Sequence, residues 1–195
     1  MKKLLRRAVV STPLGDMLAL SSDEGLCALE FMSVWSARLQ PSRRSARFQP
    51  SGLNRLTRLE RRLATWFAPH DIVDEESDVI SLTRCWLAGY FAGTATNADV
   101  PLDMHGARFE QRVWRALRDI RPGETTSYGS IAKQVGAPSA ARAVGLANGA
   151  NPIAIIVPCH RVIGSNGALT GYGGGLERKS WLIDHERRWR RDRLF

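Results

Sequence analysis

Hydrophobic and polar positions repeat along the chain with two different periods. In residues 8–34 apolar and polar residues alternate, and turn residues separate "DMLALSS" from "GLCALEF". This alternation predicts two neighbouring strands of a hairpin or meander, with Cys27 in the core. Residues 53–67 place apolar side chains every three or four positions, and "VISLTRCWLAGYFAG" does the same until Gly93. These two stretches predict helices.

Two stretches of the first half lack either period. Residues 36–52 mix Ser, Pro and Arg, which predicts a surface loop, and "HDIVDEESD" (70–78) predicts an acidic loop. The first half therefore predicts a small α/β domain, and we find no catalytic constellation of residues in it.

The second half predicts three more helices. Residues 107–120 carry an apolar side at helical spacing, and "RPGE" ends the pattern. "TSYGSIAKQVG" predicts a short helix that a Ser or Thr caps and Gly136 closes. "APSAARAVGLANG" predicts another helix, from Pro138 and Ser139 to Gly149. Two short helices joined by a tight glycine turn are typical of a helix-turn-helix.

The second helix of this pair is made mostly of small residues, and Arg142 is its main large polar side chain. Small side chains allow close approach to a flat partner, but they also suit a tightly packed core helix. The chain has a net charge of +9, and most of the excess lies after residue 102. This excess indicates either a polyanionic partner such as nucleic acid or a solvated basic face. The helix pair and the charge together favour nucleic acid.

Length and composition limit the class of protein to which this chain can belong. The 195 residues are 44% hydrophobic and 24% charged, which is typical of one large or two small globular domains. No apolar stretch is long enough to cross a bilayer, and the apolar run in "MKKLLRRAVV" is too short for a signal peptide. We therefore expect a cytoplasmic protein with reduced thiols and no membrane contact. Its three cysteines are far apart, which gives a zinc site little support.

The segment "IIVPCHRVIG" (155–164) holds the strongest candidate for chemistry. An apolar run, which predicts a buried strand, stops at Pro158, and Cys159 and His160 follow. A cysteine attacks as its thiolate, so it needs a base, and that base needs a third group to orient it. Glu186 in "WLIDHERR" is the candidate for the third group. A Cys-His pair alone leaves both a nucleophile and an ordinary buried thiol open.

A longer pattern around this pair narrows the choice. "NPIAIIVPCHRVIGSNGALTGYGGGLERKSWLIDHE" closely resembles the active-site segment of the O6-alkylguanine-DNA alkyltransferases, and "TSYGSIA" and "ARAVG" match upstream in the same order. The resemblance covers about residues 90 to 186. It implies a ribonuclease-H-like α/β domain (1–102), followed by a winged-helix-like, helix-turn-helix DNA-binding domain (103–195).

The resemblance implies direct repair of DNA without a cofactor. The alkyl group on O6 of a flipped-out guanine, or on O4 of thymine, would move irreversibly to Cys159, once per molecule. His160 would act as the base through a water, and Glu186 would fix its tautomer. Tyr128 would donate a proton to the leaving guanine, and Asn151 would brace the turn before the cysteine.

The same resemblance implies a binding surface for double-stranded DNA. Arg142 would fill the space that the flipped base leaves, from a helix in the minor groove. Tyr172 would form a wall of the base pocket, and Lys179 would contact the pocket or a phosphate. The full set of expected DNA and substrate contacts is Arg142, Ser127, Ser139, Ala140, Ala141, Val162, Tyr172, Gly173 and Lys179. We expect Arg161 to brace the fold through buried hydrogen bonds.

Some features depart from the family pattern. The basic end "RRWRRDRLF" continues past Glu186 and is expected to add phosphate contacts. Cys27 and Cys85 do not reproduce the structural zinc set of some relatives, and we expect surface or capping roles for His70 and His105. The alternatives are a non-catalytic protein that binds alkylated DNA and a DNA-binding regulator. We expect a monomer that acts on DNA containing alkylated guanine or thymine.

Overall fold

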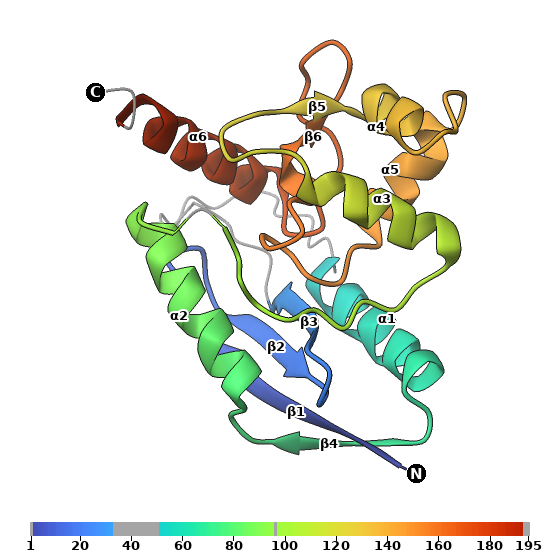
Figure 1. The fold of residues 1–195 in the computed structure, drawn as a ribbon, viewed down its shortest axis with the longest axis vertical. Coiled ribbons are helices and arrows are strands. Elements are labelled where there is room, and N and C mark those ends of the chain that lie inside the picture. Colours follow the sequence, from blue (N-terminus) through green and yellow to red (C-terminus); the bar gives the residue numbers. More distant parts are fainter. Residues whose placement is uncertain (1, 33–50, 96, 193–195) are drawn as a thin grey trace, which may run out of the picture.

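A four-stranded sheet supports the first half of the chain. The computed structural model describes residues 2–32, 51–95 and 97–192. The sheet has the order β3-β2-β1-β4, and its strands are β1 (Lys3–Val10), β2 (Met17–Ser21), β3 (Leu26–Phe31) and β4 (His70–Asp74). Strands β1 to β3 form an antiparallel meander, and β4 runs parallel to β1. The sheet occupies the lower half of Figure 1.

Helices α1 (Ser51–Trp66) and α2 (Asp78–Ala92) pack against different side chains of this sheet. Leu59 and Leu63 of α1 pack with Cys27. Leu87 of α2 packs in a second and larger cluster, which includes Leu29. Ala28 belongs to the first cluster and its neighbour Leu29 to the second, and neighbouring residues of a strand point to opposite faces. The two helices therefore cover opposite faces.

The predicted hairpin and both helices of this half are confirmed, but the acidic loop is not. Its first five residues form β4, in which Ile72 lies opposite Leu5 of β1. Ile72 packs against the cluster that contains Leu59 and Leu63 of α1. This contact favours a strand at Ile72, although acidic residues surround it in the sequence. Strand β1 was not predicted either. Of the predicted surface loop (36–52), residues 36–50 lie outside the described residues, and residues 51–52 begin α1, so the loop is wrong at those two positions.

The second half forms a compact set of short elements above the sheet in Figure 1. They are α3 (Arg108–Arg118), β5 (Thr126–Ser127), α4 (Tyr128–Gln134), α5 (Ala141–Gly149), the single-turn helix η1 (Cys159–Arg161), β6 (Val162–Ile163) and α6 (Leu176–Asp192). Trp114 of α3 is fully buried, and its indole nitrogen donates to the carbonyl of Ala147 in α5 at 2.8 Å. Helix α3 thus packs against α5, the second helix of the predicted helix-turn-helix, and supports it.

The two halves share hydrogen bonds along the edge of the sheet. Leu29 of β3 donates to the carbonyl of Pro152 and accepts from the amide of Ala154, each at 2.9 Å. The segment that leads to Cys159 is therefore fastened to β3. The architecture is mixed α and β, as predicted. The expected limits of the two domains, 1–102 and 103–195, stay a prediction.

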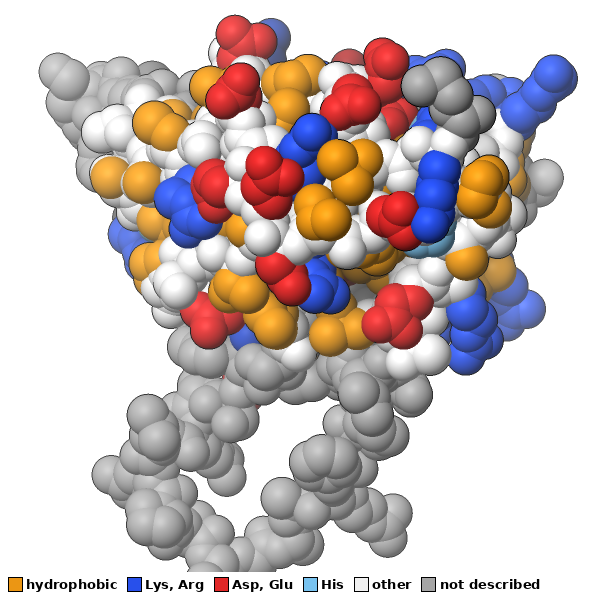
Figure 2. All heavy atoms as spheres, turned by 90° about the horizontal axis from the view of Figure 1, so that it is seen from below, with side chains coloured by type: hydrophobic (Ala, Val, Ile, Leu, Met, Phe, Trp, Pro, Cys, Tyr) orange, Lys and Arg blue, Asp and Glu red, His pale blue; other side chains and the backbone are white. Residues whose placement is uncertain are grey.

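The surface near the sheet has a balanced charge. Acidic and basic side chains are intermixed on the face in Figure 2. Ion pairs on β1 and α2 join Arg6 to Asp23, Arg7 to Asp74 and Arg84 to Glu76. In the part of the chain that the structure describes, no helix has the length and apolar character to cross a membrane.

Candidate active site

A buried carboxylate organises the candidate site. Glu186 of α6 accepts a hydrogen bond at Oε1 from Nε2 of His160, at 2.9 Å. Arg161 donates Nη2 to Oε1 at 2.8 Å and Nε to Oε2 at 2.9 Å. The amide of Gly123 donates to Oε2 at 3.0 Å. His160 and Glu186 are 0% and 1% exposed, so solvent does not screen these interactions.

The pKa values of both Glu186 and His160 lie below their usual values, so that Glu186 is ionised and His160 is neutral. Burial alone would raise the pKa of Glu186, but His160 and the hydrogen bonds from Arg161 bring it well below its usual value. Burial lowers the pKa of His160, although Glu186 acts in the opposite direction. We therefore assign an ionised Glu186 and a neutral His160 that donates its Nε2 proton. Nδ1 of His160 has no hydrogen-bond partner among the described residues and can accept a proton.

Cys159 begins η1 directly after Pro158 and is 4% exposed. The expected strand before it is absent from this segment, so that prediction is wrong. Ile153 forms only an isolated bridge with Leu29, and turns follow it. Ile155 has a φ of 69°, which is rare for a β-branched residue. This turn directs the chain inward at Pro158, which a continuing strand would not do.

Side-chain amides hold this turn from inside. Asn151 donates Nδ2 to the carbonyl of Val157 at 2.8 Å, and its Oδ1 accepts from the amide of Ile153 at 3.0 Å. Asn148 of α5 donates Nδ2 to the carbonyl of Cys159 at 3.2 Å. Both asparagines are buried. Asn151 thus holds together the turn before Cys159, and Asn148 joins α5 to Cys159.

The short parallel pair β5–β6 connects the cysteine segment to α4. Thr126 lies opposite Val162, and Ser127 opposite Ile163. The hydroxyl of Ser127 caps α4 by accepting from the amide of Ser130 at 3.0 Å. Tyr128 is the first residue of that helix, and its hydroxyl donates to the carbonyl of Thr170 at 3.2 Å. The pairing thus brings Tyr128 to the glycine-rich loop.

The glycine-rich loop (171–175) closes over His160. The rings of Tyr172 and His160 are 6.4 Å apart in an edge-to-face arrangement, and Gly173 is exposed. Lys179 is fully buried, and Nζ donates to the carbonyls of Val162 at 2.5 Å and Thr170 at 2.7 Å. Burial lowers the pKa of Lys179 to about 8. Nζ of Lys179 thus joins two segments of the chain, and the expected contact of Lys179 with the pocket or a phosphate stays a prediction.

Helix α5 presents an exposed side, and its Gly145 lies beside the ring of Tyr128. Arg142 is exposed, and Leu146 one turn later is 73% exposed. The helix begins at Ala141 rather than at Pro138 and Ser139, because residues 138–139 form a turn before it. Ser139 is exposed, and Ala140 and Ala141 are half-buried.

Comparisons with known proteins decide the family. Residues 108–188 match the family described as 6-O-methylguanine DNA methyltransferase, DNA binding domain. The methylated-DNA–protein-cysteine methyltransferase of Methanosarcina acetivorans is 40% identical over 179 residues, which cover 92% of this chain and 96% of that protein. This chain belongs to the methylated-DNA–protein-cysteine methyltransferase family.

Further matches agree with this methyltransferase family. A relative of the same name from Mycolicibacterium paratuberculosis is 67% identical over 102 residues, which cover 52% of this chain and 62% of that protein. The OGT of Mycobacterium tuberculosis, solved in complex with DNA, has a TM-score of 0.70 and 40% identity, and the match covers 95% of this chain and 94% of that one. The family resemblance expected from residues 90 to 186 is confirmed and extends into the first half.

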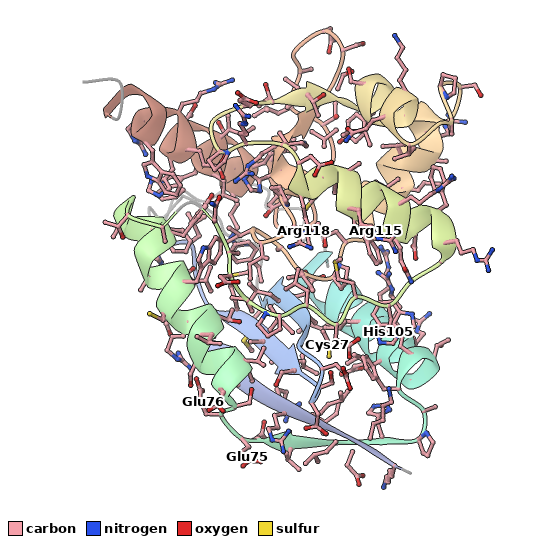
Figure 3. All side chains as sticks on the ribbon, viewed as in Figure 1. Cys27, Glu75, Glu76, His105, Arg115 and Arg118 are labelled. Atoms are coloured by element: carbon pink, nitrogen blue, oxygen red, sulfur yellow. The ribbon has the colours of Figure 1, made fainter. Side chains whose placement is uncertain are left out.

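Cys27, His70 and His105 of this methyltransferase family member lie outside the site. Cys27 is buried, and burial raises its pKa to about 12. Figure 3 places Cys27 and His105 near the sheet and α1, in the lower half of the view. His105 contacts Asp103 at 2.7 Å, and His70 begins β4. No group of three potential metal ligands gathers in residues 2–32, 51–95 and 97–192.

Three residues that no sequence pattern indicated, Tyr90, Asn148 and Arg178, support the methyltransferase site. Tyr90 of α2 donates its hydroxyl to Oε1 of Glu186 at 2.7 Å. Asn148 was treated only as part of the helix. Arg178 is fully buried, donates to the carbonyls of Leu14 and Gly174 at 2.9 Å, and stacks 4.2 Å from the ring centre of Phe31. Arg178 thereby links the glycine-rich loop to the sheet.

The basic end of the chain packs back on α2 where the structure describes it. Helix α6 continues past Glu186 to Asp192. Trp189 is buried, with its ring 4.9 Å from that of Tyr90. This part of the tail therefore supports the site from the side of the sheet.

Proposed function

We propose that this chain repairs alkylated DNA by moving an alkyl group from O6 of guanine to Sγ of Cys159. One observation carries the proposal. The residue after Cys159 is a neutral, buried histidine whose Nε2 is held by an ionised carboxylate and whose Nδ1 has no partner among the described residues. That is the arrangement of a base prepared to take the proton of a nucleophile.

The base side of the reaction follows from this arrangement. His160 accepts the thiol proton at Nδ1 through one bridging water, and Glu186 stabilises the imidazolium that forms. The thiolate of Cys159 attacks the alkyl carbon, a C–S bond forms and the C–O6 bond breaks. The resulting thioether is stable, so each molecule acts once. No cofactor enters this scheme.

The acid side falls to Tyr128. The electron pair of the broken bond moves into the guanine ring, and the phenol of Tyr128 donates its proton toward N3. Tyr128 fits this role because its hydroxyl already reaches the loop that carries Tyr172. Tyr172, Gly173 and the backbone of Val162 line the pocket for the flipped base, and Lys179 holds two of its segments together. O4 of thymine is the second substrate position.

Helix α5 is the proposed DNA-binding element. Its small residues allow close approach in the minor groove, and exposed Arg142 enters the stack in place of the flipped base. Ser127, Ser139, Ala140 and Ala141 lie at the ends of the helix pair, where they contact the backbone of double-stranded DNA. The OGT of Mycobacterium tuberculosis, a family member of similar fold, was solved with DNA, which supports this partner.

We extend the proposal to the fold and the assembly. The sheet order β3-β2-β1-β4, with β4 parallel to β1, supports a ribonuclease-H-like first domain. The packing of α3, α4 and α5 supports a winged-helix-like second domain. We propose that the chain acts on DNA as a monomer in the cytoplasm.

Transfer of a labelled methyl group tests the function. A duplex with one O6-[³H-methyl]guanine is mixed with the wild-type chain and with Cys159→Ser, and protein-bound label is counted. We expect label to saturate at about one methyl per wild-type chain and to be absent from the variant. Lesion-dependent binding without label would favour a non-catalytic DNA-binding protein, and equal binding to undamaged DNA would favour a regulator.

A further inference from the structure

Glu186 receives a hydrogen bond from the first half of the chain, in addition to those from its own half. Its Oε1 accepts from three donors, Tyr90, His160 and Arg161, at 2.7, 2.9 and 2.8 Å. Tyr90 belongs to α2, whereas His160 and Arg161 belong to η1. Tyr90 therefore competes with His160 for the same oxygen.

The phenol of Tyr90 is a fixed donor. The ring is 0% exposed, and it packs against Trp86, Phe91 and Trp189. Burial, followed by the charge of Glu186, raises the pKa of Tyr90 well above its usual value. The hydroxyl thus keeps its proton, and an ionised carboxylate can only accept it.

We propose, on the basis of the function proposed above, that Tyr90 is a positioning residue that shares Oε1 of Glu186 with His160 and so sets how strongly the carboxylate holds the imidazole. Each donor on a carboxylate oxygen withdraws negative charge from it. Without the phenol, more of that charge acts on His160 and favours the imidazolium. Tyr90 thereby keeps His160 neutral, which the base must be before it can take a proton.

Several other charged and titratable groups lie near His160 and have to be distinguished from the hydroxyl of Tyr90. The charges that act on His160 are Glu186 and Lys179 of α6 and Arg161 of η1. Cys159 precedes it in η1, and Tyr172 of the glycine-rich loop faces its ring. A second titratable ring, that of His185 in α6, lies 5.7 Å from the ring of Tyr90, and its Nε2 is 3.0 Å from the carbonyl of Tyr90. Since Tyr90→Phe keeps this ring and this carbonyl, a change in titration is expected to report the contact between the hydroxyl of Tyr90 and Glu186.

The test is the rate of alkyl transfer to Cys159 between pH 5 and 9, with O6-benzylguanine as the free base. This substrate needs no base flipping. The rate rises with pH as His160 loses its proton. For Tyr90→Phe we expect this acidic limb to lie at least about half a pH unit higher, with a rate about threefold lower at pH values well below its midpoint and a high-pH plateau within about twofold of wild type.

Two further variants separate this role from a structural one. Thr83→Val removes another buried hydroxyl of α2, which donates to Val79 and does not touch Glu186; its limb should coincide with that of wild type. Site-specific 2,3-difluorotyrosine at position 90 keeps the ring and makes the phenol a stronger donor. It should move the limb to lower pH, and it serves as the test if Tyr90→Phe does not fold.

The outcomes are distinguishable. The proposal is supported if the acidic limb moves to higher pH for Tyr90→Phe and to lower pH for difluorotyrosine at position 90. The limb of Thr83→Val should not move. A rate for Tyr90→Phe that is unchanged, or that falls equally at every pH, overturns it, as does an unmoved limb with difluorotyrosine. A wild-type chain that forms no adduct at Cys159 would overturn the proposed function instead.

Discussion

Nε2 of His160 and Oε1 of Glu186 lie 2.9 Å apart, in a space from which solvent is excluded. The two residues are 26 positions apart in the sequence, on η1 and α6. Arg161 occupies both oxygens of the same carboxylate. The carboxylate therefore orients the imidazole and remains ionised while doing so, and both consequences can be measured.

Glu186→Gln should slow alkyl transfer strongly. The amide keeps the shape but provides neither the charge that stabilises the imidazolium nor a fixed tautomer of His160. We expect a fall of roughly a hundredfold or more in the single-turnover rate, by analogy with other base-orienting carboxylates. A loss of less than about threefold would contradict the orienting role.

The same variant should lose stability in a pH-dependent way. The pKa of Glu186 is lower in the folded chain than its ordinary value of 4.5. A depressed carboxylate contributes stability that is present above its unfolded pKa and is lost as the pH falls. We expect Glu186→Gln to be less stable than wild type by about 3 kcal/mol at pH 7 in urea denaturation, because Arg161 loses its buried partner. The difference should shrink below about pH 4.5; a constant difference would argue against an ionised Glu186.

Arg142→Ala should separate repair of duplex DNA from the chemistry itself. Only the duplex needs a residue to replace the flipped base, and unstacking costs a few kcal/mol. We expect repair of duplex O6-methylguanine to slow by about tenfold or more, and reaction with the free alkylguanine base to change by less than about twofold. Arg84→Ala removes the same charge from α2 and should leave both rates unchanged. Equal losses on the two substrates would rule out the proposed role of Arg142.

Tyr128→Phe should affect transfer and leave binding intact. Without the phenol the leaving guanine has no proton donor, so we expect transfer to slow by roughly tenfold to a hundredfold. The affinity for a duplex containing the lesion should stay within about twofold, measured by fluorescence anisotropy with Cys159→Ser as the common background. A collapse of affinity would instead assign Tyr128 to DNA binding or to structure.

Asn151→Ala should destabilise the chain through the turn before Cys159. The change removes the side-chain acceptor of the Ile153 amide, and it leaves the carbonyl of Val157 with the amide of Cys159 as its donor. We expect a loss of about 2 kcal/mol or more in the free energy of unfolding. Asn166→Ala removes an exposed asparagine that accepts from the amide of Ala168 and should cost less than about 1 kcal/mol. Equal costs for the two would contradict the bracing role of Asn151.

Local patterns predicted helices α1 to α5 and the hairpin of β2 and β3. The apolar periodicity of α1 and α3 is strong, whereas α2 is marked by its many apolar residues and by Gly93 at its end. Strand β4 escaped prediction because only Ile72 and Val73 mark it among acidic residues. Tertiary pairing with β1, and not local preference, makes it a strand.

Long-range contacts explain the remaining differences. Tyr90 lies 96 positions from Glu186, and no periodicity links the two. No local pattern indicates that Arg178 and Lys179 are buried, yet both donate to backbone carbonyls of segments distant in the sequence. The turn at Ile155 replaces the expected strand because β3 bonds to this segment at only a few residues. Each of these features depends on contacts between segments that are far apart in the sequence.

Intact-protein mass spectrometry with peptide mapping tests the central claim most directly. The wild-type chain is mixed with an excess of duplex that contains one O6-methylguanine. We expect the mass of one methyl group on every chain, located on Cys159, with no further increase over time. An unchanged mass despite tight, lesion-dependent binding, or a methyl group on another residue, would contradict transfer to Cys159.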